Sequence, residues 1–382
     1  MKRATTVLGL AFFVAAAVAA TAIARPAQST GPAGADAINC SSRSLGIAAP
    51  LTGPAAFLGQ EQLSWAQYAV VNFNKQFKTS YKIVQGDTQL SASLARTVGR
   101  QFVSNSNILG VIGPSTSQAV ISSAGLFKNA ALAAVSPSAT RIDLTSGKFP
   151  TFYRVVPNDA AQSTSIVAFV ATKLKVKRVV VIDSQDDYST ALAGAMTPKF
   201  RARGVRVDRE SVAATDTDFS SIVTNVANDV GVVVFATQTA AAAQTLSQQL
   251  REQGKRAVVL GTDGAFSPSQ YKPRLGYVSS FAPDIKQIRT ARALVTGYNR
   301  FSKNKVFGTF GPPSYMAAWV LMQAANTACT DGSATRGEVN RNVKRTNTPS
   351  ILGGSVRFDR RGDVLAPKWY MFKIVNGKYS NA

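Results

Sequence analysis

Short apolar runs alternate with longer amphipathic segments along the chain from Ser44 onward. Four apolar runs in the first half have the length of buried strands: 45–49, 82–84, 108–112 and 132–135. The segment after the first run places apolar residues three and four positions apart, on one face of a helix: Leu63, Ala66, Val70, Phe73 and Phe77. This alternation predicts β-α-β units, and therefore a parallel sheet covered by helices on both faces.

A second block repeats the pattern. Its predicted strands are 178–182, 205–207, 232–235 and 258–260, and its predicted helices lie near 160–174, 188–203, 218–229 and 238–253. The rhythm then changes to a connecting stretch with a short strand, two helices and two closing strands: 273–283, 285–302, 314–327, 355–358 and 369–375. We therefore expect an α/β fold of two doubly wound parallel-sheet lobes, with a chain that crosses between them several times.

The first residues indicate export. Lys2 and Arg3 precede an apolar run, 7–20, and Ala22-Ile23-Ala24 offers the small residues that a signal peptidase needs. We predict a signal peptide at 1–24 and a flexible leader at 25–43, which places the protein in the periplasm or outside the cell envelope. A buried helix of a cytosolic domain is the alternative for the apolar run, which is too short to span a membrane.

The chain is strongly basic, with 43 Lys and Arg against 20 Asp and Glu and a net charge of +23. Removal of Lys2 and Arg3 leaves +21. In a cytosolic protein this charge would indicate a nucleic-acid partner. In an exported chain with scattered basic residues, it indicates a solvated surface that associates loosely with an anionic envelope, so we expect no nucleic-acid partner.

The composition narrows the possible chemistry. The chain has no histidine and only two cysteines, which excludes Ser-His-Asp and Cys-His catalysis, histidine-bound metals and cysteine-rich zinc sites. The post-strand segment 113–117, GPSTS, lacks both the dinucleotide fingerprint and the phosphate-loop spacing. We expect no cofactor, no metal and no enzymatic activity. A carboxylate enzyme that pairs Asp263 with Asp87 or Asp186 is the catalytic alternative.

Two post-strand segments of the first block offer neutral hydrogen-bond donors. Ser117 in GPSTS can cap the following helix, whose first amides form an anion site. The segment SPSAT, 136–140, adds the hydroxyl of Thr140. Ligands of doubly wound sheets bind at the carboxyl ends of the strands, so these groups could hold a carboxylate. They could also be ordinary caps and turns.

Two residues of the second block complement that carboxylate site. Asp263 follows the predicted strand 258–260 and is a candidate partner for an ammonium group. Tyr188 follows another strand and combines an apolar ring with a polar tip. The alternatives are a turn residue or helix cap for Asp263, and packing within its own lobe for Tyr188.

The order of several motifs resembles the substrate-binding proteins of branched-chain amino acid ABC transporters, the leucine–isoleucine–valine type within the type I periplasmic binding proteins. The similarity extends from about residue 44 to 375. It is carried by IAAPLTGPAAFLG at 47–59, QGDT at 85–88, VIGPSTS at 111–117, AVSPSAT at 134–140, YRVVPND at 153–159, DSQDDY at 183–188, DTDFSSIV at 216–223, LGTDG at 260–264 and SVRFDRRGD at 355–363.

The resemblance implies a Venus-flytrap protein with crossovers near Pro157, Ser280 and Arg357. Lobe one would then comprise 44–157 plus 281–356, and lobe two 158–280 plus 357–382. A membrane permease and an ATPase would be its partners, and we expect a monomer. By matching positions, lobe one would bind a ligand carboxylate, Asp263 would bind the α-ammonium, and Tyr188 would close over the ligand. The matched lobe-one residues are Ser117, Ser138, Ala139 and Thr140.

Two positions depart from the family pattern. Leu58 and Gln238 stand where relatives often have an aromatic residue. The resemblance therefore implies an amino acid or amino-acid-like ligand without assured branched-chain selectivity, and the amide of Gln238 would suit a larger, more polar or amide-like ligand. A ligand-sensing receptor or regulatory amide-binding protein of the same fold is the alternative function.

The two cysteines are expected to meet. Cys40 precedes the first strand and Cys329 ends the helix that contains Trp319, so both should lie at the end of lobe one remote from the cleft. An oxidising compartment favours a Cys40–Cys329 disulfide. Lipid modification of Cys40 is the alternative, although Ala37-Ile38-Asn39 is a poor match to the required motif.

Overall fold

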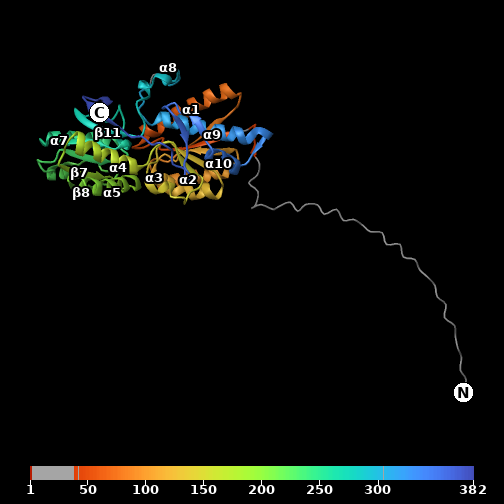
Figure 1. Cartoon of the computed structure of the whole chain (residues 1–382), viewed down its shortest axis with the longest axis horizontal. Helices are drawn as coiled ribbons and strands as arrows, with labels where there is room; N and C mark the ends of the chain where they lie inside the picture. Colours follow the sequence, from red (N-terminus) through yellow and green to blue (C-terminus); the bar gives the residue numbers. More distant parts are fainter. Residues whose placement is uncertain (2–37, 42, 304) are drawn as a thin grey trace. The chain divides into compact units, whose positions relative to one another are not determined.

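The computed structural model describes residue 1 and residues 38–41, 43–303 and 305–382 (Figure 1). The predicted signal peptide and most of the predicted leader lie outside the described residues. None of the helices in the described part of the chain combines the length and the apolar character needed to span a bilayer.

The first sheet has five parallel strands in the order β3-β2-β4-β5-β6. Its strands are β2 Ser44–Ala49, β3 Lys82–Asp87, β4 Ile108–Ile112, β5 Ala133–Ser136 and β6 Phe152–Arg154. The helices that pack on it are α1 Ala56–Phe77, α2 Ala92–Ser104, α3 Ser117–Asn129, α9 Gly311–Ala328 and α10 Arg336–Lys344. We call this sheet and its helices lobe one.

Alternate residues of β2 explain why lobe one has helices on both faces. Leu45 and Ile47 enter the apolar cluster built with α1, α9 and α10, whereas Ala48 enters the cluster built with α2 and α3. Side chains along a strand point to opposite faces in turn, so both faces of this apolar strand need a cover. Figure 1 shows α1 and α9 on one side of the sheet and α2 and α3 on the other.

The second sheet has seven strands in the order β16-β15-β11-β10-β9-β7-β8. Five strands are parallel, β7 Arg178–Asp183, β8 Arg206–Ser211, β9 Val232–Ala236, β10 Val258–Gly261 and β11 Leu275–Ser280, and two are antiparallel at the edge, β15 Tyr370–Val375 and β16 Lys378–Asn381. Its helices are α4 Asp159–Ala168, α5 Asp187–Arg201, α6 Ser220–Asn225 and α7 Ala240–Glu252. We call this sheet and its helices lobe two.

Lobe two follows the same alternation. Val180 and Ile182 of β7 pack in one apolar cluster with α6 and α7, and Val179 and Val181 pack in another with α4 and α5. The strands are apolar on both faces because each face carries helices. The predicted α/β fold of two doubly wound parallel-sheet lobes is therefore confirmed.

The chain passes between the two sheets three times. It leaves β6 for α4, leaves β11 for α8 (Arg292–Phe301) and α9, and leaves β14 (Ser355–Arg357) for β15. These passages are near the crossovers expected at Pro157, Ser280 and Arg357, and the residue boundaries of the lobes stay a prediction.

Several elements differ from the prediction. The helix expected at 218–229 is only Ser220–Asn225, in a stretch of Val, Asn and Asp, which are weak helix formers. The segment before α8 forms two short 3₁₀ turns. β14 pairs with β13 (Asn347–Pro349) in a separate small sheet and does not close the large one. The sequence pattern missed β6, α10 and β16, because three- and four-residue strands and a polar helix carry a weak periodic signal.

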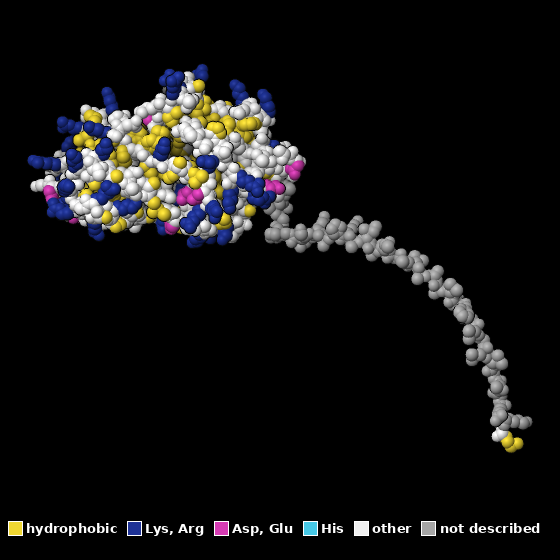
Figure 2. Space-filling model, in the orientation of Figure 1, with side chains coloured by type: hydrophobic (Ala, Val, Ile, Leu, Met, Phe, Trp, Pro, Cys, Tyr) yellow, Lys and Arg dark blue, Asp and Glu magenta, His cyan; other side chains and the backbone are white. Residues whose placement is uncertain are grey.

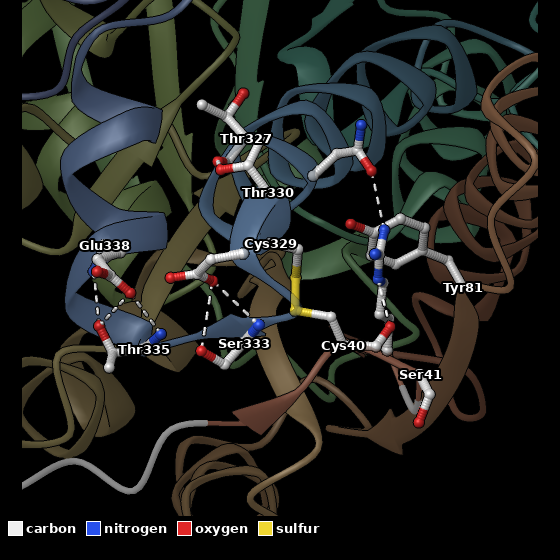
Figure 3. The surroundings of a disulfide bond; sticks show 12 residues. Cys40, Ser41, Tyr81, Thr327, Cys329, Thr330, Ser333, Thr335 and Glu338 are labelled. Atoms are coloured by element: carbon white, nitrogen blue, oxygen red, sulfur yellow. Dashed lines mark hydrogen bonds between the residues drawn. A yellow bond between two sulfur atoms is a disulfide. The ribbon is translucent and has the colours of Figure 1, made fainter.

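The predicted Cys40–Cys329 disulfide is present, with a Cα–Cα distance of 5.9 Å (Figure 3). Both cysteines are buried. Strand β1 (Ile38–Asn39) lies within the segment assigned to the leader, and it pairs with β12 (Ser333–Ala334) directly after the second cysteine. The bond therefore attaches the start of the described chain to the end of α9, 289 residues later.

Removal of this bond should destabilise the protein. Cys40→Ser with Cys329→Ser should lower the free energy of unfolding by about 2–5 kcal/mol, because the unfolded chain regains the entropy of a long loop. Denaturant unfolding of the double variant against the parent measures this difference. Mass spectrometry of the unreduced protein is the control, and two free thiols or a lipid on Cys40 would contradict the assignment.

Candidate functional site

A small cavity of about 10 Å³ lies between the two lobes. Parallel strands of both sheets end toward it, as expected for ligand sites of doubly wound folds. It is lined from lobe one by Leu58, Ser115, Thr116, Ser117, Ser138 and Phe310, and from lobe two by Tyr188, Gln238, Asp263 and Gly264. Six of the eight predicted site residues line this cavity, and Ala139 and Thr140 do not.

The loop after β4 approaches β2 closely. Gly113 has a φ of +108°, and a Cβ there would lie 2.6 Å from the Ala48 carbonyl oxygen. Only glycine fits such a position, and the tight path places Ser115, Thr116 and Ser117 at the cavity. Sequence reasoning assigned the helix cap to Ser117. This is wrong, because Thr116 is the N-cap residue, it makes no side-chain cap hydrogen bond, and Ser117 is already the first residue of α3.

A buried hydrogen-bond network joins the two serine-rich loops of lobe one. Gln62 of α1 donates from Nε2 to Ser138 Oγ at 2.7 Å, and Ser115 Oγ donates to Gln62 Oε1. Ser138 Oγ in turn donates to the Ser115 carbonyl at 2.6 Å. Both loops are therefore held in one arrangement. The sequence did not lead us to Gln62 or Ser115, because the position of a residue after a strand does not show whether it contacts α1.

Ala139 and Thr140 are buried behind the cavity wall. The amide of Ala139 donates to Ser136 Oγ at 3.0 Å, so it is already used. The Thr140 hydroxyl is buried without a hydrogen-bond partner, and the Thr140 carbonyl accepts from the amide of Asp159 at 2.8 Å. This hydroxyl lies next to the buried acid Asp159.

Asp263 supplies negative charge from lobe two. It begins the short 3₁₀ turn after β10, and Gly264 keeps the turn close to Thr237, whose carbonyl oxygen would lie 2.3 Å from an added Cβ. The Asp263 carboxylate accepts from Tyr188 Oη at 2.6 Å and from Gln162 Nε2. Burial raises the pKa of Asp263 to about 6, although these two hydrogen bonds lower it.

Asp159 is a second buried carboxylate beside Asp263, and sequence reasoning missed it. It is the first residue of α4, only 1% exposed, and neither of its oxygens has a hydrogen-bond partner. Burial, and then the negative charge of Asp263, raise its pKa to about 8. The Thr140 hydroxyl lies close enough to lower this pKa without making a hydrogen bond of normal geometry. Asp159 could have been predicted, since it ends the motif YRVVPND and lies two residues after the crossover expected near Pro157.

Tyr188 is fixed by the start of α5. Asp186 caps this helix, with its carboxylate accepting from the amides of Tyr188 and Ser189, each at 2.9 Å. The Tyr188 ring packs within lobe two, and its hydroxyl reaches Asp263. Burial, then the charges of Asp263 and Asp159, raise the pKa of Tyr188, so the phenol stays a hydrogen-bond donor.

The apolar wall comes from Leu58 and Phe310. Phe310 precedes α9, and Glu61 holds this point of the chain by accepting from the amides of Gly308 and Gly311 at 2.7 and 2.6 Å. Burial raises the pKa of Glu61 to about 7. Phe310 packs edge-on against Phe281 with ring centroids 5.4 Å apart. Sequence reasoning missed Phe310, which lies far from the motifs in the chain.

Two polar contacts connect the lobes beside the cavity. The side-chain amides of Gln118 in α3 and Gln238 in lobe two exchange hydrogen bonds at 3.3 Å in both directions. Arg141 pairs with Asp187 at 3.1 Å, with both side chains partly exposed. These contacts hold the lobes together around the site.

The catalytic alternative receives no geometric support. Asp87 anchors a turn, accepting from the amides of Leu51 and Thr52 at 2.8 and 3.2 Å. Asp186 is engaged as the cap of α5. Neither residue lines the cavity with Asp263. Among the described residues, no group of His, Cys, Asp and Glu is arranged to hold a metal ion.

Similar proteins cover nearly the whole chain. The "Leu/Ile/Val-binding protein homolog 3" of Brucella melitensis is 28% identical over 351 residues, which is 87% of this chain and 92% of the relative. The leucine binding protein LivK of Thermotoga maritima has a TM-score of 0.80 at 21% identity, covering 89% of this chain and 97% of that structure. LivJ of Streptococcus pneumoniae, in complex with isoleucine, has a TM-score of 0.79 at 24% identity, with coverages of 88% and 97%.

The same fold also binds another kind of ligand. A solute binding protein of an ABC transporter from Rhodopseudomonas palustris, in complex with benzoate, has a TM-score of 0.77 at 15% identity and covers 88% of this chain and 94% of that structure. At these identities the solved structures define the fold, and the family comes from a profile described as periplasmic binding protein, which matches residues 43–378. The chain therefore belongs to the periplasmic binding protein family and is a solute-binding protein rather than an enzyme.

Proposed function

We propose that this protein captures an amino acid or a close analogue between its lobes, as the extracytoplasmic binding component of an ABC uptake system. The observation that carries the proposal is the carboxylate of Asp263 in the cavity, with the buried Asp159 near it, opposite the hydroxyls of Thr116 and Ser117. This arrangement has the charge pattern of an ammonium beside a carboxylate.

A cation would stabilise the acidic side of the site. Both oxygens of Asp159 lack a hydrogen-bond partner, although the side chain is almost fully buried. A buried charge without a partner is costly, and such a group takes up a proton instead. A ligand ammonium next to Asp159 and Asp263 would supply the missing donors and keep both groups ionised.

The lobe-one side suits a carboxylate. Ser117 brings a hydroxyl group to the cavity at the amino terminus of α3, whereas the hydroxyls of Ser115 and Ser138 already donate within lobe one. Hydrogen-bond donors and a helix amino terminus stabilise an anion without a full positive charge. The hydroxyl of Thr116, which lines the cavity without a hydrogen-bond partner, is a further donor for this half of the ligand.

The remaining wall gives the expected selectivity. Leu58 and Phe310 are apolar, whereas Gln238 presents an amide that is hydrogen-bonded to Gln118. The cavity has room of only about 10 Å³ in this structure, so the lobes would have to part to admit a ligand. We therefore propose an amino acid or amide-bearing analogue, with the Gln238 amide facing its side chain.

Closure of the two lobes explains how a permease could distinguish the ligand-bound protein from the empty one. Lobe one would hold the carboxylate and lobe two the ammonium, so only the closed form makes both sets of contacts. A ligand shifts the open–closed equilibrium only by its preference for one state. The closed form would then be recognised by a permease, whose ATPase works inside the cell, and the periplasm or envelope exterior would be the site of action.

Experiments can distinguish the proposed function from two alternatives. The benzoate complex in the same fold makes a carboxylate without an amine the main rival ligand class. A sensing receptor or regulatory amide-binding protein would use the same cleft without a permease. The two buried acids favour the ammonium-bearing ligand over the first rival.

The ligand class can be tested by thermal denaturation. At a hundredfold excess over its dissociation constant, a ligand adds about 2.7 kcal/mol to the stability of the folded state. We expect one or more free amino acids to raise the melting temperature, and benzoate or the matching desamino acid to raise it much less. A rise with benzoate alone, or only with sugars, would show that the ligand class is wrong.

Asp263→Asn should weaken amino-acid binding at least about tenfold, because a buried partner of a charge typically contributes several kcal/mol. Titration calorimetry measures the dissociation constants. Asp229→Asn, which removes one exposed carboxylate of lobe two, is the matched control and should bind like the parent. The desamino analogue should bind the parent weakly and lose little more in Asp263→Asn. Equal binding of the amino acid by Asp263→Asn and parent would remove the main support for the ammonium site.

Amino-acid affinity should fall by about tenfold or more as the pH decreases from about 8 to about 5. The pKa values of about 6 for Asp263 and about 8 for Asp159 mean that the empty site takes up protons over this range. An ammonium ligand must displace them, so calorimetry near pH 6 should show proton release in buffers of different ionisation enthalpy. The desamino analogue is the control and should not bind more weakly at low pH. An unchanged amino-acid affinity would contradict the assignment.

A further inference from the structure

A hollow of about 650 Å³ lies at the end of lobe two opposite the cavity. The carboxyl ends of β9 and β10 lead to the cavity, whereas the hollow lies where β10 and β11 begin and where the antiparallel β15 ends. The face of α7 and the connection from 255 to 257 complete its wall. The hollow is thus separated from the ligand site by the length of the sheet.

The hollow is lined by six cationic residues and no acidic one: Arg251, Lys255, Arg256, Lys272, Arg274 and Lys373. None of the six is among the ion pairs of the described residues. Elsewhere in lobe two, Arg178, Arg206 and Arg209 each face a carboxylate. Lys255 donates to the carbonyls of Thr224 and Val226, and the other five repel one another without a carboxylate partner in the described residues, a repulsion that an anionic partner would relieve.

Exposed apolar residues lie among these charges. Leu275 and Val375 face each other across β11 and β15 and are 41% and 43% exposed. Val258 at the start of β10 also lines the hollow. A floor of apolar side chains below a rim of cationic residues complements an amphiphile with an anionic head group better than a purely ionic solute.

The positive charge continues along the same end of the sheet. The segments before β7 and β8 carry Lys173, Lys175, Lys177, Arg201 and Arg203. Asp229, before β9, is already engaged by Arg178 and Arg206. Figure 2 shows Lys and Arg side chains far outnumbering Asp and Glu on the face that it draws. The hollow is thus part of a basic edge broad enough to contact many anionic groups at once.

We propose that the hollow and this basic edge bind the phosphate head groups of an anionic phospholipid membrane. The cationic rim contacts the phosphates, and Leu275 and Val375 contact the glycerol and acyl boundary. Because this surface is at the opposite end of the sheet from the cavity, lobe two can rest on the membrane without its amino-acid site being covered. The contact raises the local concentration of the binding protein at the membrane surface and needs no lipid anchor.

The test compares two triple variants with the same net charge. Arg256→Gln, Lys272→Gln and Arg274→Gln remove charge from the hollow, and Lys75→Gln, Arg100→Gln and Lys128→Gln remove charge from exposed positions of lobe one. Both sets reduce the net charge of the chain from +23 to +20. They share the same amino-terminal segment, so any effect of that segment cancels.

Binding is measured by co-sedimentation of the purified protein with vesicles. The parent should bind vesicles of equal parts phosphatidylglycerol and phosphatidylcholine and should not bind phosphatidylcholine alone. Each cationic residue near an anionic membrane contributes about 1 kcal/mol, so the hollow variant should bind about a hundredfold more weakly. The lobe-one variant should keep most of the parent affinity. Unchanged melting temperatures of both variants show that the fold is retained.

Three results would overturn the proposal. Equal losses in both triple variants would show that only the net charge matters. Equal binding of the parent to the two kinds of vesicle would exclude recognition of anionic head groups. Displacement from vesicles by inorganic phosphate at the same concentration of phosphate groups would indicate a site for a free anion instead of a membrane surface.

Discussion

The buried negative charge between the lobes is the constraint on which the site depends. Asp159 and Asp263 lie next to each other away from water, and their pKa values rise to about 8 and about 6 for that reason. Asp263 has Tyr188 and Gln162 as donors, whereas Asp159 has none. An unpartnered buried acid of this kind takes up a proton, because its ionised form is among the most unfavourable arrangements in a protein. Its presence at the junction of two sheets is best explained by a cation that arrives with the ligand.

The rest of the site keeps these acids opposite a neutral polar wall. Gln62 connects the loops of Ser115 and Ser138 through buried hydrogen bonds, and Gly113 and Gly264 let both lobes bring backbone close to the cavity. The positions of the donors are therefore set before the ligand binds, and little ordering remains to oppose binding. The Gln118–Gln238 hydrogen bonds are long at 3.3 Å and the Arg141–Asp187 pair is partly exposed, which suits groups that must separate when the lobes open.

The two ends of lobe two carry opposite charge. The carboxyl ends of its strands lead to buried acids, and the opposite end collects cationic residues without ion-pair partners around a partly apolar hollow. A chain with a net charge of +23 still offers a negative site to its ligand, because local burial and geometry determine the field in a small cavity. The net charge therefore indicates attraction between the protein surface and an anionic envelope, and it does not predict the charge of the ligand.

The sequence alone determined the α/β fold, the helix-covered sheets, the disulfide and six residues that line the cavity, because apolar periodicity and post-strand position are local properties. It misplaced the cap of α3 and missed Asp159, Gln62, Ser115 and Phe310. Only the tertiary structure decided these, since each depends on groups that are far apart in the chain. Asp159 becomes a buried acid only when α4 of lobe two begins against the Thr140 loop of lobe one. The basic hollow likewise forms only where α7, β11 and β15 meet, because charges scattered along a sequence become one surface only through folding.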